Sequence, residues 1–211
     1  MTQNAANDSV VVVIDDDSAV RAALKELLES VGLKVILFQS AGEFLESAVP
    51  DTTCCMVLDV RMPVMSGIKL QEELARAEVQ VPIVFITGHG DIAMAVRAMK
   101  AGAVDFLAKP FSNQDLLDAV FAALEQDRAR RNQEESISTL REYFNSLSVR
   151  EKEVLSRVAT GRLNKQIAAE LGVSEVMVKV HRANGMRKMR AKSVAEWVRM
   201  TDLLRAGQAL S

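Results

Sequence analysis

Short apolar runs alternate with amphipathic segments through the first 125 residues of the chain. Five runs of four or five largely apolar residues predict strands, at Val10–Ile14, 35–38, 54–58, 83–86 and 103–107. Between these runs, apolar residues recur at helical spacing and predict helices, most clearly over Gly67–Arg76 and Ile92–Lys100. Strands that alternate with helices and are apolar almost throughout are typical of a sheet buried on both faces. We therefore predict an α/β fold with a doubly wound, five-stranded parallel sheet.

A further helix is predicted from about Ser112, and neither Gly nor Pro interrupts it before residue 145. Its first part carries an apolar stripe formed by Leu116, Leu117, Val120, Phe121 and Leu124. Residues 125–136 are polar on every face, and the stripe then resumes at Ile137, Leu140 and Phe144. We expect a helical linker over residues 126–145 that is solvated in its middle. A coiled-coil contact along it is an alternative that the polar middle disfavours.

Four shorter helices are predicted after this linker. Ser148 and Glu151 have the spacing of a capping box, and Asn164, Ser174 and Ser193 are placed to cap the helices that follow. A Gly-Val-Ser turn joins the second and third of these helices, which is the spacing of a helix-turn-helix. This second region is therefore predicted to be all-α.

The net charge of −2 conceals an asymmetry between the two regions. Residues 1–125 contain 9 Lys and Arg against 18 Asp and Glu, whereas residues 126–211 contain 17 against 10. An acidic region joined to a basic one predicts two domains with different partners, and nucleic acid suits the basic domain. We place the domains at residues 1–125 and 146–211, with residues 126–145 as the linker.

Composition excludes several other classes of protein. Hydrophobic residues make up 49% of the chain, which excludes a mainly disordered protein. No apolar run approaches the roughly 18 residues of a membrane span, and the first residues lack the pattern of a secretory signal. Cys54 and Cys55 are adjacent within an apolar run, which fits a reducing compartment, and two histidines are too few for a typical zinc site. We expect a cytoplasmic protein that does not associate with membranes.

Polar side chains stand at the carboxyl ends of four predicted strands. Asp15 and Asp16 follow the first strand, Asp59 the third and Thr87 the fourth, and the fifth leads into Lys109. These ends face one crevice in an open parallel sheet, so we expect the side chains to converge. Three carboxylates together need a cation, and an all-oxygen set of this kind suits Mg²⁺. A lysine and a hydroxyl on the far side are suited to hold phosphoryl oxygens.

Motifs over residues 8–125 resemble those of the receiver domain of two-component response regulators. They are Val-Ile-Asp-Asp-Asp, Leu-Asp-Val-Arg-Met-Pro, Ile-Thr-Gly-His-Gly-Asp, Ala-Met-Lys-Ala-Gly-Ala-Val-Asp-Phe and Ala-Lys-Pro-Phe. The second region resembles the LuxR-type helix-turn-helix in Leu-Ser-Val-Arg-Glu-Lys-Glu-Val-Leu, Asn-Lys-Gln-Ile-Ala-Ala-Glu-Leu-Gly-Val-Ser and Val-Lys-Val-His-Arg-Ala-Asn. Together they are similar to the NarL/FixJ family, in its FixJ-like branch, which implies a flavodoxin-like receiver sheet.

The resemblance implies a role for each residue of the predicted crevice. Asp59 would be the phosphoacceptor, whose carboxylate attacks the phosphorus of a phosphohistidine. Mg²⁺ would be held by the side chains of Asp15, Asp16 and Asp59 and by the backbone carbonyl of Arg61.

Further receiver residues take their roles from the same resemblance. Lys109 and Thr87 would each hold a phosphoryl oxygen. Phe106 would be the switch aromatic, which turns inward when Thr87 moves toward the phosphoryl group. The Lys109-Pro110 peptide bond would be cis.

For the second domain, the resemblance implies a recognition helix that enters the major groove of promoter DNA. The residues that would face the groove are Lys179, Val180, Arg182 and Ala183. The residues that would contact phosphates are Lys165, His181 and Lys188. A merely solvated basic helix is the alternative that the helix-turn-helix spacing disfavours.

The implied function is that of a response regulator rather than an enzyme. A sensor histidine kinase would phosphorylate the chain, which would then form a homodimer and regulate transcription, with RNA polymerase as a further candidate partner. The dimer contacts would lie on the fourth helix and fifth strand of the receiver, with Ala95, Val96, Met99 and Lys100 as candidates.

Three other functions are weighed against this one. An orphan regulator would bind DNA without phosphorylation. A Mg²⁺-dependent phosphatase with an aspartyl nucleophile is disfavoured, because that class has Asp-x-Asp after its first strand. The segment from Gly88 to Ala93 fits G-x-G-x-x-A, but a dinucleotide site belongs after the first strand and needs an acid about 20 residues on.

Two residues of the second domain depart from the family's usual pattern. Met177 stands where a small Thr is usual, and Gly185 where a branched apolar residue is usual. We hypothesise that the indole of Trp197 fills the space left at Gly185. The alternative places Trp197 on an exposed face or in a dimer contact. Core positions are expected for Phe44, Phe85, Met94, Met99, Phe121 and both cysteines.

Overall fold

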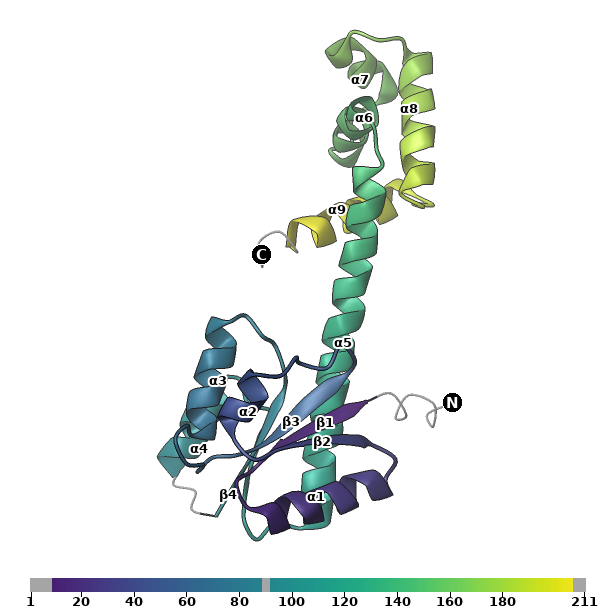
Figure 1. The fold of residues 1–211 in the computed structure, drawn as a ribbon. Coiled ribbons are helices and arrows are strands. Elements are labelled where there is room, and N and C mark those ends of the chain that lie inside the picture. The colour runs from purple at the N-terminus through teal and green to yellow at the C-terminus, as the bar shows by residue number, and fades with distance from the viewer. Residues whose placement is uncertain (1–8, 89–91, 207–211) are drawn as a thin grey trace. The chain divides into compact units, whose positions relative to one another are not determined.

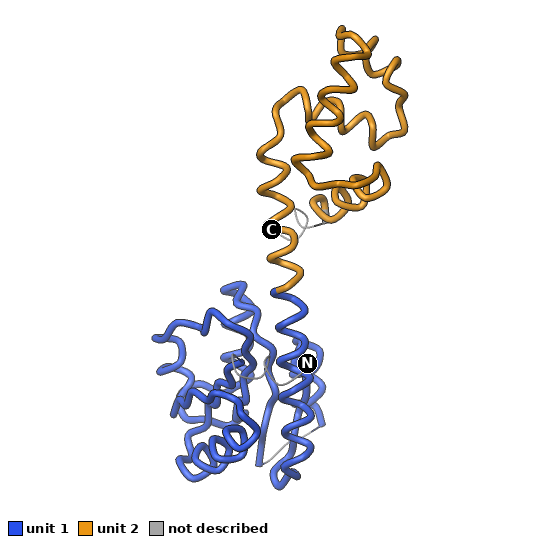
Figure 2. The backbone as a smooth tube through the Cα atoms, turned by 90° about the vertical axis from the view of Figure 1, so that its right-hand side faces the viewer, with its two compact units in different colours: residues 1–131 blue, residues 132–211 orange. Residues whose placement is uncertain are grey.

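The computed structural model describes residues 9–88 and 92–206. Its strands are β1 (Val10–Ile14), β2 (Lys34–Phe38), β3 (Cys54–Asp59), β4 (Ile83–Thr87) and β5 (Asp105–Ala108). Its helices are α1 (Ser18–Ser30), α2 (Ala41–Leu45), α3 (Gly67–Arg76), α4 (Ile92–Lys100), α5 (Asn113–Asn145), α6 (Val149–Ala159), α7 (Asn164–Leu171), α8 (Glu175–Lys188) and α9 (Val194–Ala206). The chain forms two compact units, Met1–Arg131 and Asn132–Ser211 (Figure 2). Part of the G-x-G-x-x-A segment, residues 89–91, lies outside the described residues.

The strands of the first unit form one parallel sheet with the order β2-β1-β3-β4-β5. Helices cover both of its faces (Figure 1). Phe44 of α2, Leu70 of α3 and Ala98 of α4 pack in the cluster on one face. Leu28 of α1 and Leu116 of α5 pack in the cluster on the other. The predicted doubly wound α/β fold is confirmed, because every strand separates two apolar layers.

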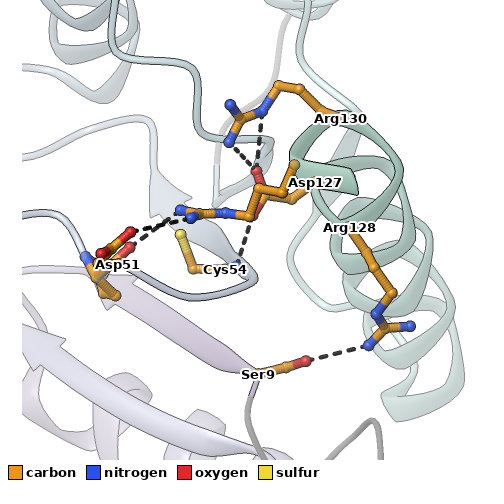
Figure 3. Close-up of polar contacts among 8 residues, drawn as sticks. Ser9, Asp51, Cys54, Asp127, Arg128 and Arg130 are labelled. Carbon is orange, nitrogen blue, oxygen red and sulfur yellow. Dashed lines mark hydrogen bonds and ion pairs between the residues drawn. The ribbon is translucent and has the colours of Figure 1, made fainter. Parts of the chain in front are cut away.

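Helix α5 is continuous over 33 residues, and its middle is not solvated throughout. Asp127 is fully buried. Its carboxylate accepts hydrogen bonds from the backbone N–H of Cys54 (2.9 Å), at the start of β3, and from Arg130 (2.6 Å) and Arg131 (2.8 Å) (Figure 3). We call these four residues the Asp127 cluster. The expectation of a solvated helix is therefore wrong over residues 127–131, which belong to the first unit.

Two further contacts tie this part of α5 to the first unit. The guanidinium of Arg128 donates to the hydroxyl of Ser9 (3.4 Å), next to β1 (Figure 3). Arg131 donates to the carbonyl of Pro50 (3.2 Å), in the segment that precedes β3. The polar residues that were predicted to form a solvated linker thus donate hydrogen bonds to segments that precede β1 and β3.

The second unit contains α6 to α9 together with the last turns of α5. Ser148 and Glu151 form the predicted capping box, with bonds of 3.2 Å and 2.8 Å between each side chain and the other's backbone N–H. Asn164 is not the cap of α7 but its first residue. The N–H of Leu163, which precedes it, donates instead to the side chain of Gln166 (2.9 Å).

The hypothesis that Trp197 fills a space at Gly185 is wrong. A Cβ on Gly185 would lie 2.7 Å from Cδ1 of Leu155, so that leucine already occupies the space. Trp197 is 2% exposed, stacks on Phe144 with ring centroids 6.4 Å apart, and donates from Nε1 to the carbonyl of Leu155 (3.0 Å). Trp197 is therefore a core residue beside Leu155, which also excludes the alternative of an exposed face.

Two of the expected core residues lie at the surface. Met99 on α4 and Phe121 on α5 are each 44% exposed. Each sits on the outer side of a helix whose inner side packs on the sheet, as Ala98 and Val120 show. The expected burial is confirmed for Phe44, Phe85, Cys54 and Cys55, and Met94 is partly buried.

Candidate functional site

Four strand ends of the first unit carry the residues of the predicted crevice. Asp15 directly follows β1, Asp59 ends β3, Thr87 ends β4, and Lys109 directly follows β5. Because the sheet is parallel, all four positions are carboxyl ends and lie along one edge.

The ammonium of Lys109 brings two carboxylates together. Its Nζ lies 2.8 Å from Oδ2 of Asp15 and 2.9 Å from Oδ1 of Asp59. Both aspartates are buried, whereas the lysine side chain is partly exposed. The structure thus places one cation between two buried acidic groups, beside solvent.

Backbone groups hold both carboxylates in place. Oδ2 of Asp59 accepts from the N–H of Arg61 (2.7 Å), and Oδ1 of Asp15 accepts from the N–H of Asp17 (2.8 Å). Asp17 in turn caps α1 by accepting from the N–H of Ala19 (2.8 Å). The chain therefore turns into α1 immediately after β1, which keeps Asp15 at the strand end.

Thr87 and Phe106 lie on the two neighbouring strands at this edge. Thr87 is buried, and its carbonyl accepts from the N–H of Lys109 (2.7 Å). The ring of Phe106 is partly buried, with its centroid 6.2 Å from that of Phe85. The expected cis Lys109-Pro110 bond is present.

Gly67 belongs to this site, although its sequence context did not single it out. Helix α3 begins at Gly67, and a Cβ there would overlap the carbonyl oxygen of Asp59 and lie 2.9 Å from Cγ of Leu58. Glycine is therefore required where α3 approaches the end of β3. A signal was available, since this glycine directly follows Ser66, which caps α3.

Burial and charge shift the ionisation of the two central groups. Burial raises the pKa of Asp59 above its usual value, and the hydrogen bond and charge of Lys109 lower it only in part, against the charge of Asp15. Burial alone would lower the pKa of Lys109, but the hydrogen bonds to Asp15 and Asp59 outweigh this, and its pKa is raised. Lys109 therefore stays protonated between the two acids.

The donor chemistry of this edge fits Mg²⁺, although the three carboxylates do not converge as expected. Asp16 is exposed, and within the described residues no group of three His, Cys, Asp or Glu side chains forms a metal-ligand cluster. Asp15 and Asp59 do converge, and a single lysine cannot neutralise both. Mg²⁺ typically takes one or two carboxylates and keeps several waters, so two buried carboxylates with Asp16 adjacent suit it.

The second unit exposes several residues that were predicted to contact DNA. Lys165 is exposed on α7, and Lys179, Val180 and Ala183 are exposed on α8. His181 is half-buried.

Two other predicted DNA contacts are engaged within the unit. Arg182 is half-buried, and its Nη1 donates to Oδ1 of Asn164 (3.3 Å), which ties α8 to α7. Nζ of Lys188 lies 2.7 Å from Oε2 of Glu151 and 3.2 Å from the carbonyl of Ser146, which ties α8 to the start of α6. Both cationic groups thus make contacts within the unit, and the side chain of Lys188 is still 39% exposed.

Comparisons with known proteins agree with this architecture. The response regulator receiver domain matches residues 11–121, and the luxR family of bacterial regulatory proteins matches residues 145–201. The chain therefore belongs to the two-component response regulators that join a receiver to a LuxR-type DNA-binding domain, and it is a transcription regulator of that class.

Its relatives cover nearly the whole chain. Nodulation protein W of Bradyrhizobium diazoefficiens is 54% identical over 95% of this chain and 88% of its own length. The transcriptional regulatory protein FixJ of Azorhizobium caulinodans is 46% identical over 92% of each chain. The solved response regulator StyR matches with a TM-score of 0.85 and 50% identity, over 92% of this chain and 98% of that one. The resemblance to the FixJ-like regulators is confirmed.

Across residues 9–88 and 92–206, no helix combines the length and the apolar character that a membrane crossing requires.

Proposed function

We propose that Asp59 accepts a phosphoryl group from a sensor histidine kinase and that this modification controls DNA binding. The observation that carries the proposal is Lys109, whose ammonium joins the buried carboxylates of Asp15 and Asp59 at the carboxyl edge of the sheet. A cation in this position is suited to bind a phosphoryl oxygen as soon as Asp59 carries one.

In the proposed transfer, a carboxylate oxygen of Asp59 attacks the phosphorus of a phosphohistidine. A P–O bond forms while the P–N bond breaks, and the electron pair of that bond returns to the imidazole of the kinase. The N–H of Arg61 holds the other oxygen of Asp59 in place. Lys109 pairs with one phosphoryl oxygen, and the hydroxyl of Thr87 donates to another.

Mg²⁺ would be held by the side chains of Asp15, Asp16 and Asp59 and by the backbone carbonyl of Arg61. When bound, it supplies positive charge that offsets the charge of the transferring group. Asp16 is the exposed member of this set, so its side chain has room to turn toward the ion.

Phosphorylation then shifts an equilibrium toward a state that forms homodimers. Thr87 and Phe106 transmit the change, since both lie on the strands next to α4. That helix already exposes apolar side chains, with Val96 and Met99 45% and 44% exposed. We assign Ala95, Val96, Met99 and Lys100 to the dimer contact.

The dimer would bind promoter DNA through α8 and regulate transcription in the cytoplasm. The exposed Lys165 and Lys179 and the surplus of basic residues in this unit support binding to phosphates. RNA polymerase is the further partner that we propose for the bound dimer.

Phosphate labelling tests the role of Asp59. The full chain is incubated with Mg²⁺ and labelled acetyl phosphate, beside Asp59→Asn and the control Asp118→Asn, which changes an exposed aspartate on α5. We expect Asp59→Asn to lose the label and keep the wild-type circular dichroism, while Asp118→Asn labels normally. Label at the wild-type rate in Asp59→Asn would show that another residue is the acceptor.

DNA affinity with and without acetyl phosphate separates this proposal from the orphan alternative. A phosphorylation-dependent regulator binds DNA more tightly after treatment, and Asp59→Asn does not respond. Equal affinity in both conditions would support an orphan regulator. Steady turnover of a general phosphate monoester would instead support the phosphatase.

A further inference from the structure

Helix α8 carries an exposed apolar stripe on its outer face. Val176, Val180 and Ala183 are spaced by four and then three residues, so they lie on one side of the helix. Val176 is 68% exposed and Val180 is 45% exposed, and Ala183 is exposed as well. Met177, at 44% exposure, lies three residues before Val180 and widens the stripe. We call these four residues the α8 apolar stripe.

The stripe faces away from the core of the second unit. Val178, Gly185 and Met189 are buried, and their spacing of seven and then four residues places them on the opposite side of the helix. The outer residues are therefore exposed on a well-packed helix. Single exposed apolar residues are ordinary, but several along one face indicate a surface that meets a partner.

Positive charge borders the stripe. Lys179 is exposed beside Val180, and Arg187 is exposed four residues after Ala183. This arrangement is complementary to the major groove of DNA. The bases form the floor of the groove and would face the apolar residues, and the phosphates lie along its two sides and would face the cationic ones. In the major groove, the C5-methyl of thymine is the apolar group that a base presents.

We propose that Val176 and Val180, with Met177 beside them, recognise thymine C5-methyl groups in the target DNA. The proposal rests on the proposed DNA binding of α8 and adds the chemistry of its base recognition. It assigns sequence discrimination to apolar contacts and leaves backbone binding to the lysines and arginines.

The first step of the test identifies the DNA sequence that the full chain binds. The chain is treated with Mg²⁺ and acetyl phosphate and is then used to enrich the duplexes that it binds from a random-sequence pool. The enriched duplex is then made again with deoxyuridine in place of thymine at one position at a time, which removes only the methyl group. We expect about fourfold weaker binding at each contacted thymine, the equivalent of exposing one methyl group.

Matched variants assign the effect to the stripe. Val176→Ser and Val180→Ser remove both γ-methyl groups and leave a small polar side chain. Each variant should bind the thymine and deoxyuridine duplexes within about twofold at its own position, a non-additive pairing. Val149→Ser, at the exposed first residue of α6, should keep the full discrimination. Val180→Asn provides a second variant without a terminal methyl group in case a serine variant fails to fold.

The outcomes separate this inference from the proposed function. Failure to enrich any sequence would overturn sequence-specific DNA binding, and the inference with it. Enrichment without an effect of deoxyuridine would overturn only the inference. An effect of deoxyuridine that persists undiminished in the Val176 and Val180 variants would overturn the assignment to this stripe.

Discussion

Lys109 links the electrostatics of the strand-end site to its chemistry. Its ammonium contacts both Asp15 and Asp59, and it lowers a pKa that burial has raised. Asp59 must be ionised to attack phosphorus, so its raised pKa moves the lower pH limit of phosphoryl uptake upward. Lys109 opposes that effect in addition to its proposed contact with the product.

Replacing Lys109 with methionine should raise the pKa of Asp59 further. The variant loses the hydrogen bond and the charge that lower this pKa, while burial and the charge of Asp15 remain. A carboxylic acid with a higher pKa is protonated up to a higher pH, so phosphoryl uptake should begin to fall at a higher pH than in the wild type. Carbon-13 NMR titration of the Asp59 carboxyl measures the shift directly. Lys69→Met, on the exposed side of α3, is the control and should leave the titration unchanged; an unchanged pKa in Lys109→Met would contradict the assignment.

Gly185 should tolerate a larger side chain only if Leu155 becomes smaller. Gly185→Ile places atoms where Cδ1 of Leu155 lies, and overpacking a core costs about 1–3 kcal/mol in the free energy of unfolding. In a Leu155→Ala background the same change should cost less, because the displaced side chain is gone. Trp197 is the only tryptophan and lies in this unit, so its fluorescence during urea unfolding reports the unit separately. If the effects of Gly185→Ile and Leu155→Ala on the free energy of unfolding are additive, the two side chains do not compete for the same space.

At the level of elements, the periodicity of apolar residues predicted the strands and helices, because these depend on residues close together in the chain. The strands were found because their residues are apolar on both faces, and the capping box at Ser148 because both partners lie within one turn. The burial of Asp127 could not be found in this way. Its partner at the start of β3, the N–H of Cys54, is 73 residues away in the chain, and a run of charges normally indicates a solvated face. The sequence also grouped Asp16 with Asp15, because the two residues are adjacent at the end of the first strand. In the structure Asp15 is buried and Asp16 is exposed.

Removing the carboxylate of Asp127 should destabilise the first unit. Asp127→Ala leaves Arg130, Arg131 and the N–H of Cys54 without this acceptor. The two arginines are partly exposed, so the main cost is the buried N–H of Cys54 left without a partner, about 1–3 kcal/mol. Glu125→Ala removes an exposed partner of Arg128 on the same helix and should change stability by less than about 1 kcal/mol. Urea unfolding followed by far-UV circular dichroism compares the two variants, and hydrogen exchange at Cys54 localises the effect. Equal stability of both variants would show that the Asp127 cluster contributes nothing.

At the level of the whole molecule, α5 contributes to the cores of both units. Its residues Leu116 and Val120 pack on the sheet of the first unit. Leu140, Tyr143 and Phe144 pack against the cluster that contains Trp197 in the second unit. A linker boundary at residue 145 would therefore separate the second unit from part of its own core. Each unit should unfold as its own cooperative transition, so a single unfolding free energy does not describe the chain.

This arrangement predicts different behaviour for two fragments of the second unit. A fragment of residues 132–211 retains Phe144 on Trp197, whereas a fragment of residues 146–211 loses it together with Leu140 and Tyr143. These three side chains are partly buried against the cluster that contains Trp197, and a domain of this size has little stability to spare when such contacts are lost. The longer fragment should therefore melt cooperatively by tryptophan fluorescence, and the shorter one should melt at a much lower temperature or lack a transition. Residues 132–211 hold 14 Lys and Arg against 9 Asp and Glu, so the longer fragment should bind DNA with an affinity that falls steeply with salt. If both fragments melt at the same temperature, the packing of α5 on Trp197 does not contribute to the stable core. If the longer fragment folds and its DNA affinity does not change with salt concentration, the basic residues of this unit do not bind phosphates.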